Sequence, residues 1–100
     1  VLFNQNTASS GEFSAMSLLG RANTKSFGQP TAGYTTANQT FVLPDGAGLF
    51  LAVSLGADRT GKVHFPRISP DELITENGKA NEELTLTAAK KWLESKPSCR

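Results

Sequence analysis

The first twenty residues change from an apolar run to a polar turn and then to a helical pattern. Residues 1–3 are apolar throughout, as in a buried strand, and residues 4–7 are polar. Across residues 9–21, apolar side chains recur at spacings of three and four, which predicts an amphipathic helix. Its predicted core face holds Phe13, Met16 and Gly20, with Leu19 beside them. We therefore expect a strand, a turn and a helix in succession.

The middle of the chain has the pattern of a β-hairpin. Residues 25–27 predict a short strand, and residues 28–38, rich in Gly, Pro, Thr and Gln, predict a loop. Residues 40–43 and 49–55 are β-rich, and a Pro-Asp-Gly turn lies between them. In such a turn proline presets φ and glycine accepts a positive φ, so the two segments are expected to pair. Residues 63–65 predict one further short strand.

The last quarter of the chain predicts a linker and a second helix. Residues 75–80 are polar and predict the linker, and residues 82–95 predict the helix, with Asn81 as its cap. The expected apolar stripe holds Leu84, Ala88 and Trp92, widened by Ala89 and Leu93. Strands alternate with helices before the hairpin is added, so the predicted fold class is α/β with an antiparallel addition.

Composition narrows the function classes. A chain of 100 residues with 38% hydrophobic residues suits one globular domain or part of one, and the apolar start suggests that it begins inside a fold. The net charge of +1 gives no sign of nucleic acid or an anionic membrane as partner. The single cysteine, Cys99, and the single histidine, His64, cannot build a zinc site, and no cofactor or metal is expected. No segment approaches the roughly 20 apolar residues of a membrane helix.

The segment Asn-Thr-Ala-Ser-Ser-Gly-Glu, residues 6–12, is the most informative part of the chain. A serine at a strand-to-helix junction projects from the top of a sheet. The free N–H groups of the helix start can there stabilise a developing oxyanion. Serine in this position is also a common helix cap, so the local pattern leaves both interpretations of Ser9 open.

The same segment resembles the nucleophile segment of the C-terminal processing, or tail-specific, serine peptidases. Further segments that resemble this family follow in order: Gly20-Arg21, and residues 26–33, 35–38, 43–46, 57–62 and 68–71. The resemblance covers about residues 1–75 and implies a ClpP/crotonase-like fold. Residues 1–100 would then be the C-terminal portion of the catalytic domain, and the activity would be cleavage of proteins near their C-termini. The resemblance also implies that Ser9 is the nucleophile and that the Ser10 backbone N–H is one oxyanion donor. The other oxyanion donor would lie upstream of Val1.

The sequence departs from the family where the best-known members carry a lysine base, directly after a Gly-x-x-Thr-x-Gly loop. Here that loop is residues 28–33 and the next residue is Tyr34, while Lys25 lies on the wrong side of the loop. A tyrosine loses its proton only near pH 10, so it is a poor general base at neutral pH. The resemblance is therefore to a non-lysine subgroup, similar to tricorn protease, whose histidine base comes from an upstream segment.

Two more side chains are candidates for the site. Asn38 falls where lysine-type members often carry a helping glutamine, so it is expected to orient a group. Glu12 lies one helical turn after Ser9, and could contact the site or only serve as a first-turn carboxylate that favours the helix dipole. His64 is expected to be structural or exposed, Asp45 and Asp58 to be turn residues, and Trp92 to be core packing.

Three interpretations of function follow. The first is a fragment of a serine-type endopeptidase. The second is a non-catalytic binding or structural relative, as the retinoid-binding relatives of this family are. The third is an unrelated small α/β domain with a chance serine. The first requires a base within reach of Ser9, a protein or peptide substrate, and the upstream part of the same protein as a partner. The family resemblance also implies export to the bacterial cell envelope or periplasm.

Overall fold

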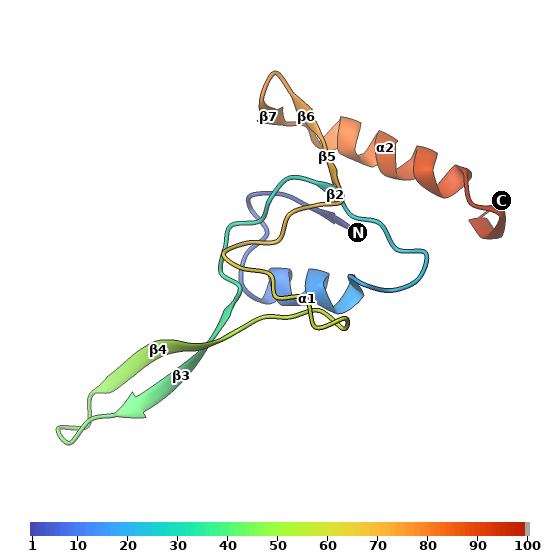
Figure 1. Ribbon diagram of the computed structural model, residues 1–100. Coiled ribbons are helices and arrows are strands. Elements are labelled where there is room, and N and C mark those ends of the chain that lie inside the picture. Colours follow the sequence, from blue (N-terminus) through green and yellow to red (C-terminus); the bar gives the residue numbers. More distant parts are fainter. Residues whose placement is uncertain (100) are drawn as a thin grey trace.

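The fold combines short strands with two helices, as the α/β pattern predicts (Figure 1). The computed structural model describes residues 1–99. Its elements are β1 (Leu2–Phe3), α1 (Ser10–Leu18), β2 (Phe27–Gly28), β3 (Thr36–Val42), β4 (Gly48–Leu55), β5 (Glu72–Leu73), β6 (Thr75–Glu76), β7 (Lys79–Ala80), α2 (Glu82–Glu94) and a 3-10 turn (Pro97–Cys99). Neither helix in this part of the chain has the length and apolar character that a membrane crossing requires.

A small parallel sheet lies between the two helices (Figure 1). Its strand order is β1-β2-β5, with Leu2 opposite Phe27 and Phe27 opposite Glu72. Below it in Figure 1, α1 contributes to a core of five buried apolar residues: Phe3, Ala15, Met16, Leu19 and Ile68. Above it, the Trp92 ring of α2 meets the Phe27 ring edge-on, with centroids 6.1 Å apart. Trp92 is half-buried and lies outside the buried apolar cluster, so the prediction of core packing holds only for its contact with the buried Phe27 ring.

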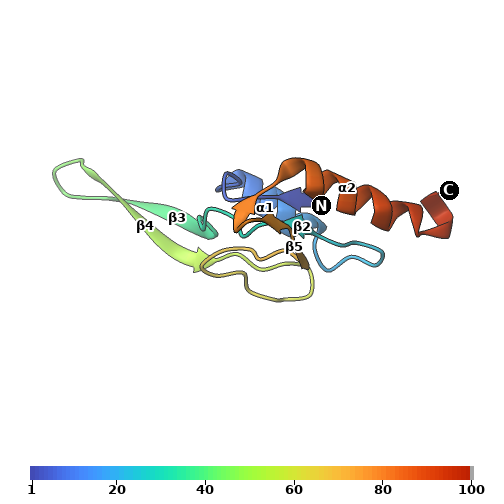
Figure 2. The ribbon, with the colours of Figure 1, turned by 90° about the horizontal axis from the view of Figure 1, so that it is seen from above.

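The predicted hairpin is confirmed and is longer than expected. β3 begins at Thr36, inside the segment predicted as a loop, and pairs with β4 from Thr36↔Leu55 to Val42↔Gly48. A β-bulge interrupts the register between Ala37 and Asn38. The hairpin extends away from the sheet and helices as a two-stranded ribbon (Figures 1 and 2). Within the described chain, nothing covers the faces of this ribbon, and every residue of β4 is exposed.

The polar segment 75–80 is a hairpin, so the prediction of a linker was wrong. β6 and β7 pair with Thr75 opposite Ala80, and the turn between them is Asn77-Gly78. Both turn residues have positive φ, 51° and 75°. Asn-Gly is a strong signal for such a two-residue turn, because asparagine and glycine tolerate positive φ. β5 was also missed, and residues 63–65 form only an isolated bridge from Val63 to Ala57.

Two details of the helices differ from the sequence pattern. α1 ends at Leu18, and its buried face includes Glu12 while Phe13 is 38% exposed. In α2 the Asn81 cap is confirmed, since its side chain accepts the Leu84 N–H at 2.9 Å. Thr85, rather than Leu84, is the buried residue of α2. Its hydroxyl donates to the Asn81 carbonyl at 2.7 Å, so burial leaves no unpaired polar group there.

Candidate active site

Ser9 lies at the N-terminus of α1, just after the turn that follows β1, as the sequence predicted. Its backbone has φ 51° and ψ −116°, a conformation that residues other than glycine rarely adopt. Such strained residues cost about 1–3 kcal/mol and are concentrated at active sites, because the surrounding structure must hold them in place. The strain at Ser9 therefore needs an explanation beyond helix capping.

Ser9 and Glu12 have a capping-box arrangement at the start of α1, in which the Glu12 carboxylate accepts the Ser9 N–H at 2.8 Å. The Ser9 side chain is exposed, and its hydroxyl makes no cap hydrogen bond of its own to the described residues. In the first turn the Gly11 N–H donates to the Ala8 carbonyl at 2.9 Å, whereas the Ser10 N–H has no acceptor among the described residues. A free hydroxyl beside a free N–H at a helix N-terminus is the arrangement that a nucleophile and one oxyanion donor require. That the hydroxyl projects from the top of the sheet stays a prediction.

Glu12 is the residue that fixes this turn. Its side chain is 0% exposed, and its carboxylate accepts three backbone N–H groups at 2.8 Å. One is the N–H of Ser9, and the others belong to Gly33 and Tyr34, at the end of the glycine loop. The Ser9 and Tyr34 N–H groups share a single carboxylate oxygen, so the loop end lies beside Ser9.

The ionisation state of Glu12 follows from these contacts. Burial alone would raise the pKa of this carboxyl, because the charged form loses its hydration. The Thr31 hydroxyl and the N–H groups of Gly33, Ser9 and Tyr34 favour the carboxylate, and together they lower the pKa below its usual value. Glu12 is therefore a carboxylate whose lone pairs are occupied, which suits it to positioning Ser9 and not to exchanging protons.

The glycine loop, residues 28–33, is hydrogen-bonded to β1 and to the turn that precedes Ser9. The Gln29 N–H donates to the Phe3 carbonyl at 3.0 Å, and the Ala32 N–H donates to the Thr7 carbonyl at 2.9 Å. Gly28 has φ 129°, and a Cβ there would lie 2.0 Å from the Phe3 carbonyl oxygen. Glycine is thus required for β2 to approach β1 this closely.

The other predicted candidates lie outside this cluster of contacts. Tyr34 is 66% exposed, and only its backbone N–H takes part in the site. Asn38 lies at the bulge of β3, is exposed, and makes no side-chain hydrogen bond within residues 1–99. Its role in orienting a group stays a prediction. The structure brings together Ser9, the Ser10 N–H and Glu12, and adds Thr31 and Gly33, which sequence reasoning did not single out.

His64 forms a buried pair with Asp58 that the sequence analysis missed. The His64 Nε2 lies 2.8 Å from the Asp58 Oδ2, and their side chains are 7% and 5% exposed. The hydroxyl of Thr60, then His64, hold the pKa of Asp58 well below its usual range. Asp58 is also the predicted turn residue, accepting the Thr60 N–H at 2.8 Å. The six-residue separation of the two side chains across this turn was the signal that could have revealed the pair.

The Asp58–His64 pair is at the wrong end of α1 to assist Ser9. It lines a cavity of about 280 Å³ together with Leu19 and Gly20, which follow the C-terminal end of the helix. α1 has 9 residues, so its ends are separated by about 13 Å at 1.5 Å per residue. Lys25 is also occupied, since its Nζ lies 2.8 Å from the Glu72 Oε2. Neither His64 nor Lys25 is therefore available as a base for Ser9.

Comparisons with known proteins identify the family of this chain. The sequence model of Peptidase family S41 matches residues 1–74. A relative named nisin-resistance protein, from Lactococcus lactis subsp. lactis, is 45% identical over 83 residues, which are 81% of this chain and 26% of that protein. A solved structure described as a lipoprotein from Streptococcus agalactiae is 42% identical with a TM-score of 0.72, covering 94% of this chain and 30% of the other. The chain thus spans less than a third of either relative.

Proposed function

Because this chain belongs to peptidase family S41, we propose that it carries the nucleophile of a serine endopeptidase whose site is completed by other parts of a longer protein. The observation that carries the proposal is Ser9 itself: a strained, exposed serine with an uncommitted hydroxyl, beside the free Ser10 N–H. A serine that only capped α1 would hydrogen-bond the first turn and would need no strain.

The proposed reaction is acyl transfer through Ser9. A base takes the hydroxyl proton while Oγ attacks the carbonyl carbon of the scissile peptide bond, and the Ser10 N–H binds the oxyanion that forms. The C–N bond then breaks, the departing nitrogen takes the proton from the base, and the acyl group stays on Ser9 as an ester. Water, deprotonated by the same base, attacks the ester and restores the Ser9 hydroxyl.

The base and the second oxyanion donor come from outside residues 1–100 in this proposal. Lys25 is paired with Glu72, His64 is paired with Asp58 near the far end of α1, and Glu12 has its carboxylate occupied. We further propose that the complete catalytic domain has a ClpP/crotonase-like fold, of which this chain is the C-terminal portion. The parallel order β1-β2-β5 and the entry of β1 into α1 support that assignment.

The proposed substrates are peptides or proteins cleaved near their C-termini at the bacterial cell envelope. One relative is described as a lipoprotein, which supports the location, and another is named for nisin resistance, which makes nisin a peptide to test first. Incubation of the full-length protein with nisin, followed by mass spectrometry, should give one cut near the C-terminus. Cuts scattered along the peptide would argue against tail specificity.

The direct test of a serine nucleophile is labelling of the full-length protein with a fluorophosphonate probe. We expect the label on Ser9, with loss of labelling in Ser9→Ala and normal labelling in Ser14→Ala, an exposed serine on the same helix. Absence of any label on Ser9 in a folded protein would favour the non-catalytic binding or structural relative instead.

The isolated chain, residues 1–100, is expected to have no peptidase activity. It lacks a base for Ser9 and one of two oxyanion donors, and loss of a single donor costs roughly 10²–10³ in rate. A fluorogenic peptide assay at high enzyme concentration measures this directly. Turnover by the isolated chain that Ser9→Ala abolishes would contradict the proposal that the site needs upstream residues.

Replacing Tyr34 with phenylalanine in the full-length protein should lower activity by much less than about 10²-fold. Loss of a general base would lower activity by at least that factor. The hydroxyl makes no hydrogen bond within the described chain, and the contact that matters, the N–H bond to Glu12, is a backbone contact that phenylalanine keeps. Steady-state kcat and KM of both proteins give the comparison. A loss as large as that of Ser9→Ala, without unfolding, would place the tyrosine in the catalytic machinery.

A further inference from the structure

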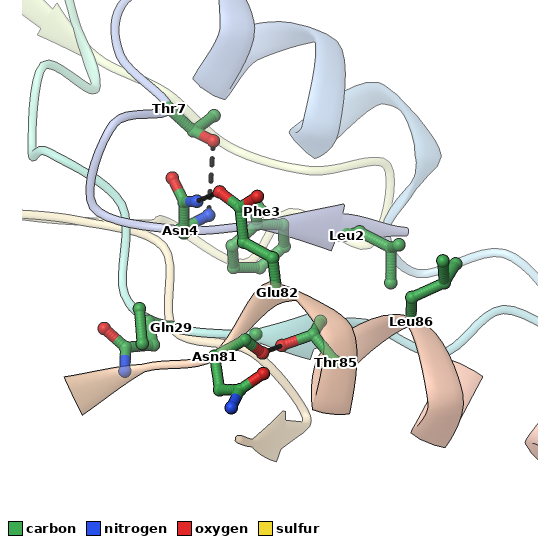
Figure 3. A pocket seen from close by; sticks show the side chains of 11 residues that line it. Leu2, Phe3, Asn4, Thr7, Gln29, Asn81, Glu82, Thr85 and Leu86 are labelled. Atoms are coloured by element: carbon green, nitrogen blue, oxygen red, sulfur yellow. Dashed lines mark hydrogen bonds between the residues drawn. The ribbon is translucent and has the colours of Figure 1, made fainter. Parts of the chain in front are cut away.

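A cavity of about 350 Å³ lies between β1, β2 and α2 (Figure 3). Its walls come from the C-terminal ends of β1 and β2 and from the first turns of α2. In parallel α/β sheets, ligands bind at the carboxyl ends of the strands. The volume falls within the 300–1,000 Å³ that is usual for small-ligand pockets and is ample for one large side chain.

The lining of the cavity is mostly apolar, with polar groups towards one end. Figure 3 shows Leu2 and Leu86 towards one end, and Asn4, Gln29 and Asn81 towards the other. Leu2 and Leu86 are each 46% exposed, so they present apolar surface that the described chain does not cover.

Among the residues that the structure describes, Glu82 is the only charged side chain in the lining. Its Oε1 accepts the Asn4 side-chain N–H at 3.3 Å. Among the described lining residues no cation faces this carboxylate, so the cavity repels a second carboxylate, and its apolar walls suit an apolar group.

The cavity is linked directly to the nucleophile turn. Thr7 lines the cavity, lies two residues before Ser9, and accepts the Ala32 N–H at its carbonyl. Its Oγ1 accepts the Asn4 N–H at 3.3 Å, so the turn that carries Ser9 is built on the cavity wall. Thr7 therefore joins the cavity wall to the turn that leads into Ser9, and Ser9 itself is not among the lining residues.

We propose that this cavity is a substrate subsite that takes an uncharged apolar side chain, such as leucine or phenylalanine, of the peptide cleaved at Ser9. This inference rests on the proposed peptidase function. The apolar side chain lies between Leu2 and Leu86, and Glu82 at the rim excludes aspartate and glutamate from the position.

The test compares two tryptophan substitutions in the full-length protein. Leu86→Trp fills the cavity, whereas Leu84→Trp places the same side chain two positions earlier on α2, at a leucine of similar exposure (42%) that does not line the cavity. Both are assayed with peptides in which each position around the cleaved bond carries leucine, phenylalanine, alanine or aspartate in turn.

Leucine or phenylalanine should be preferred to alanine at one position by roughly 10–200-fold in kcat/KM, the range that a hydrophobic pocket achieves. Leu86→Trp should remove that preference mainly through KM, and Leu84→Trp should keep it. Equal profiles for the two variants would overturn the proposal.

A second pair of proteins tests the role of the carboxylate. In Glu82→Gln the side-chain oxygen can still accept the Asn4 N–H, but the charge is gone. Discrimination against aspartate at the position that responds to Leu86→Trp should fall by roughly two- to fivefold, because Glu82 is exposed and interactions between exposed charges are weak. Unchanged discrimination would show that Glu82 does not face the substrate.

Peptide binding to the Ser9→Ala protein, followed by fluorescence anisotropy, separates this inference from the proposed function. Leu86→Trp in that background should weaken binding of the leucine peptide about tenfold or more, and Leu84→Trp should not. If the wild-type protein cleaves peptides through Ser9 but Leu86→Trp binds normally, the subsite is wrong and the peptidase stands. If cleavage does not depend on Ser9 yet binding responds to Leu86→Trp, the cavity is a peptide site and the nucleophile is wrong.

Discussion

Ser9→Ala in the full-length protein is expected to lower kcat by roughly 10⁴–10⁶-fold, as for the nucleophile of other serine peptidases. The hydroxyl makes no capping hydrogen bond, so its removal should change stability by no more than about 0.5 kcal/mol. Kinetics with a peptide substrate, together with a thermal melt, measure both quantities.

A nucleophile is identified by a large loss of kcat that occurs when it is replaced and does not occur when a neighbouring serine is replaced. Ser14→Ala, on the exposed side of the same helix, should leave both kcat and the melting temperature close to those of the wild type. Residual activity of Ser9→Ala within tenfold of the wild type, with the variant shown by mass spectrometry to be pure, would rule out acyl transfer through Ser9.

Glu12→Gln is expected to destabilise the protein by roughly 2–5 kcal/mol, because each hydrogen bond to a charged group contributes about 1.5–3 kcal/mol. The glutamine side chain has one oxygen, and its NH₂ would face at least one of the N–H groups now bound by the carboxylate. Amide exchange should become faster at Ser9, Gly33 and Tyr34. The activity of the protein that remains folded should fall about a hundredfold in kcat, since small misplacements of a reacting group have effects of that size.

Glu83→Gln provides the matched control for this substitution. Glu83 occupies the first turn of α2, as Glu12 does in α1, but it is exposed. Its replacement should change stability by no more than about 0.5 kcal/mol and leave amide exchange around Ser9 unaltered. If Glu12→Gln behaved in the same way, the carboxylate would not be what holds Ser9 in its strained conformation.

The lowered pKa of Glu12 gives this prediction a pH dependence. A carboxyl whose pKa is lower in the folded state stabilises the protein above the unfolded-state value, about 4.3, and loses that contribution as pH falls through the folded-state value. Asp58 and Asp71 have lowered pKa values too and act in the same direction. The difference between wild-type and Glu12→Gln melting temperatures should therefore be full at neutral pH and shrink below about pH 4.

Much of the local structure could be predicted because it depends on neighbouring residues. The entry of a short strand into α1, the β3–β4 hairpin around Pro44-Asp45-Gly46, and the Asn81 cap of α2 all follow from periodicity and turn chemistry within a few positions. The β6–β7 hairpin was equally local, and its Asn77-Gly78 signal was present in the sequence but was not used.

The burial of Glu12 could not be predicted in this way. Its partners Gly33 and Tyr34 lie 21 and 22 residues after Glu12 in the chain. A strand and a loop come between, and the periodicity of the sequence does not predict the path that they take. Helical spacing assigned Phe13 to the core, yet Phe13 is exposed and the carboxylate lies inside. A charged group enters the interior only where hydrogen-bond donors from distant segments compensate its lost hydration, and a local pattern contains no information about those donors.

By itself, the sequence determined the family, the order of the main elements and the position of Ser9 at a helix start. These rest on short-range chemistry and on the order of short motifs. Only the tertiary structure decided that Ser9 is strained, that Glu12 holds it to the glycine loop, and that a cavity lies beside the turn that leads into Ser9. The reason is physical. Backbone strain, a buried charge with hydrogen-bond donors around it, and cavities exist only when segments far apart in the chain are packed together.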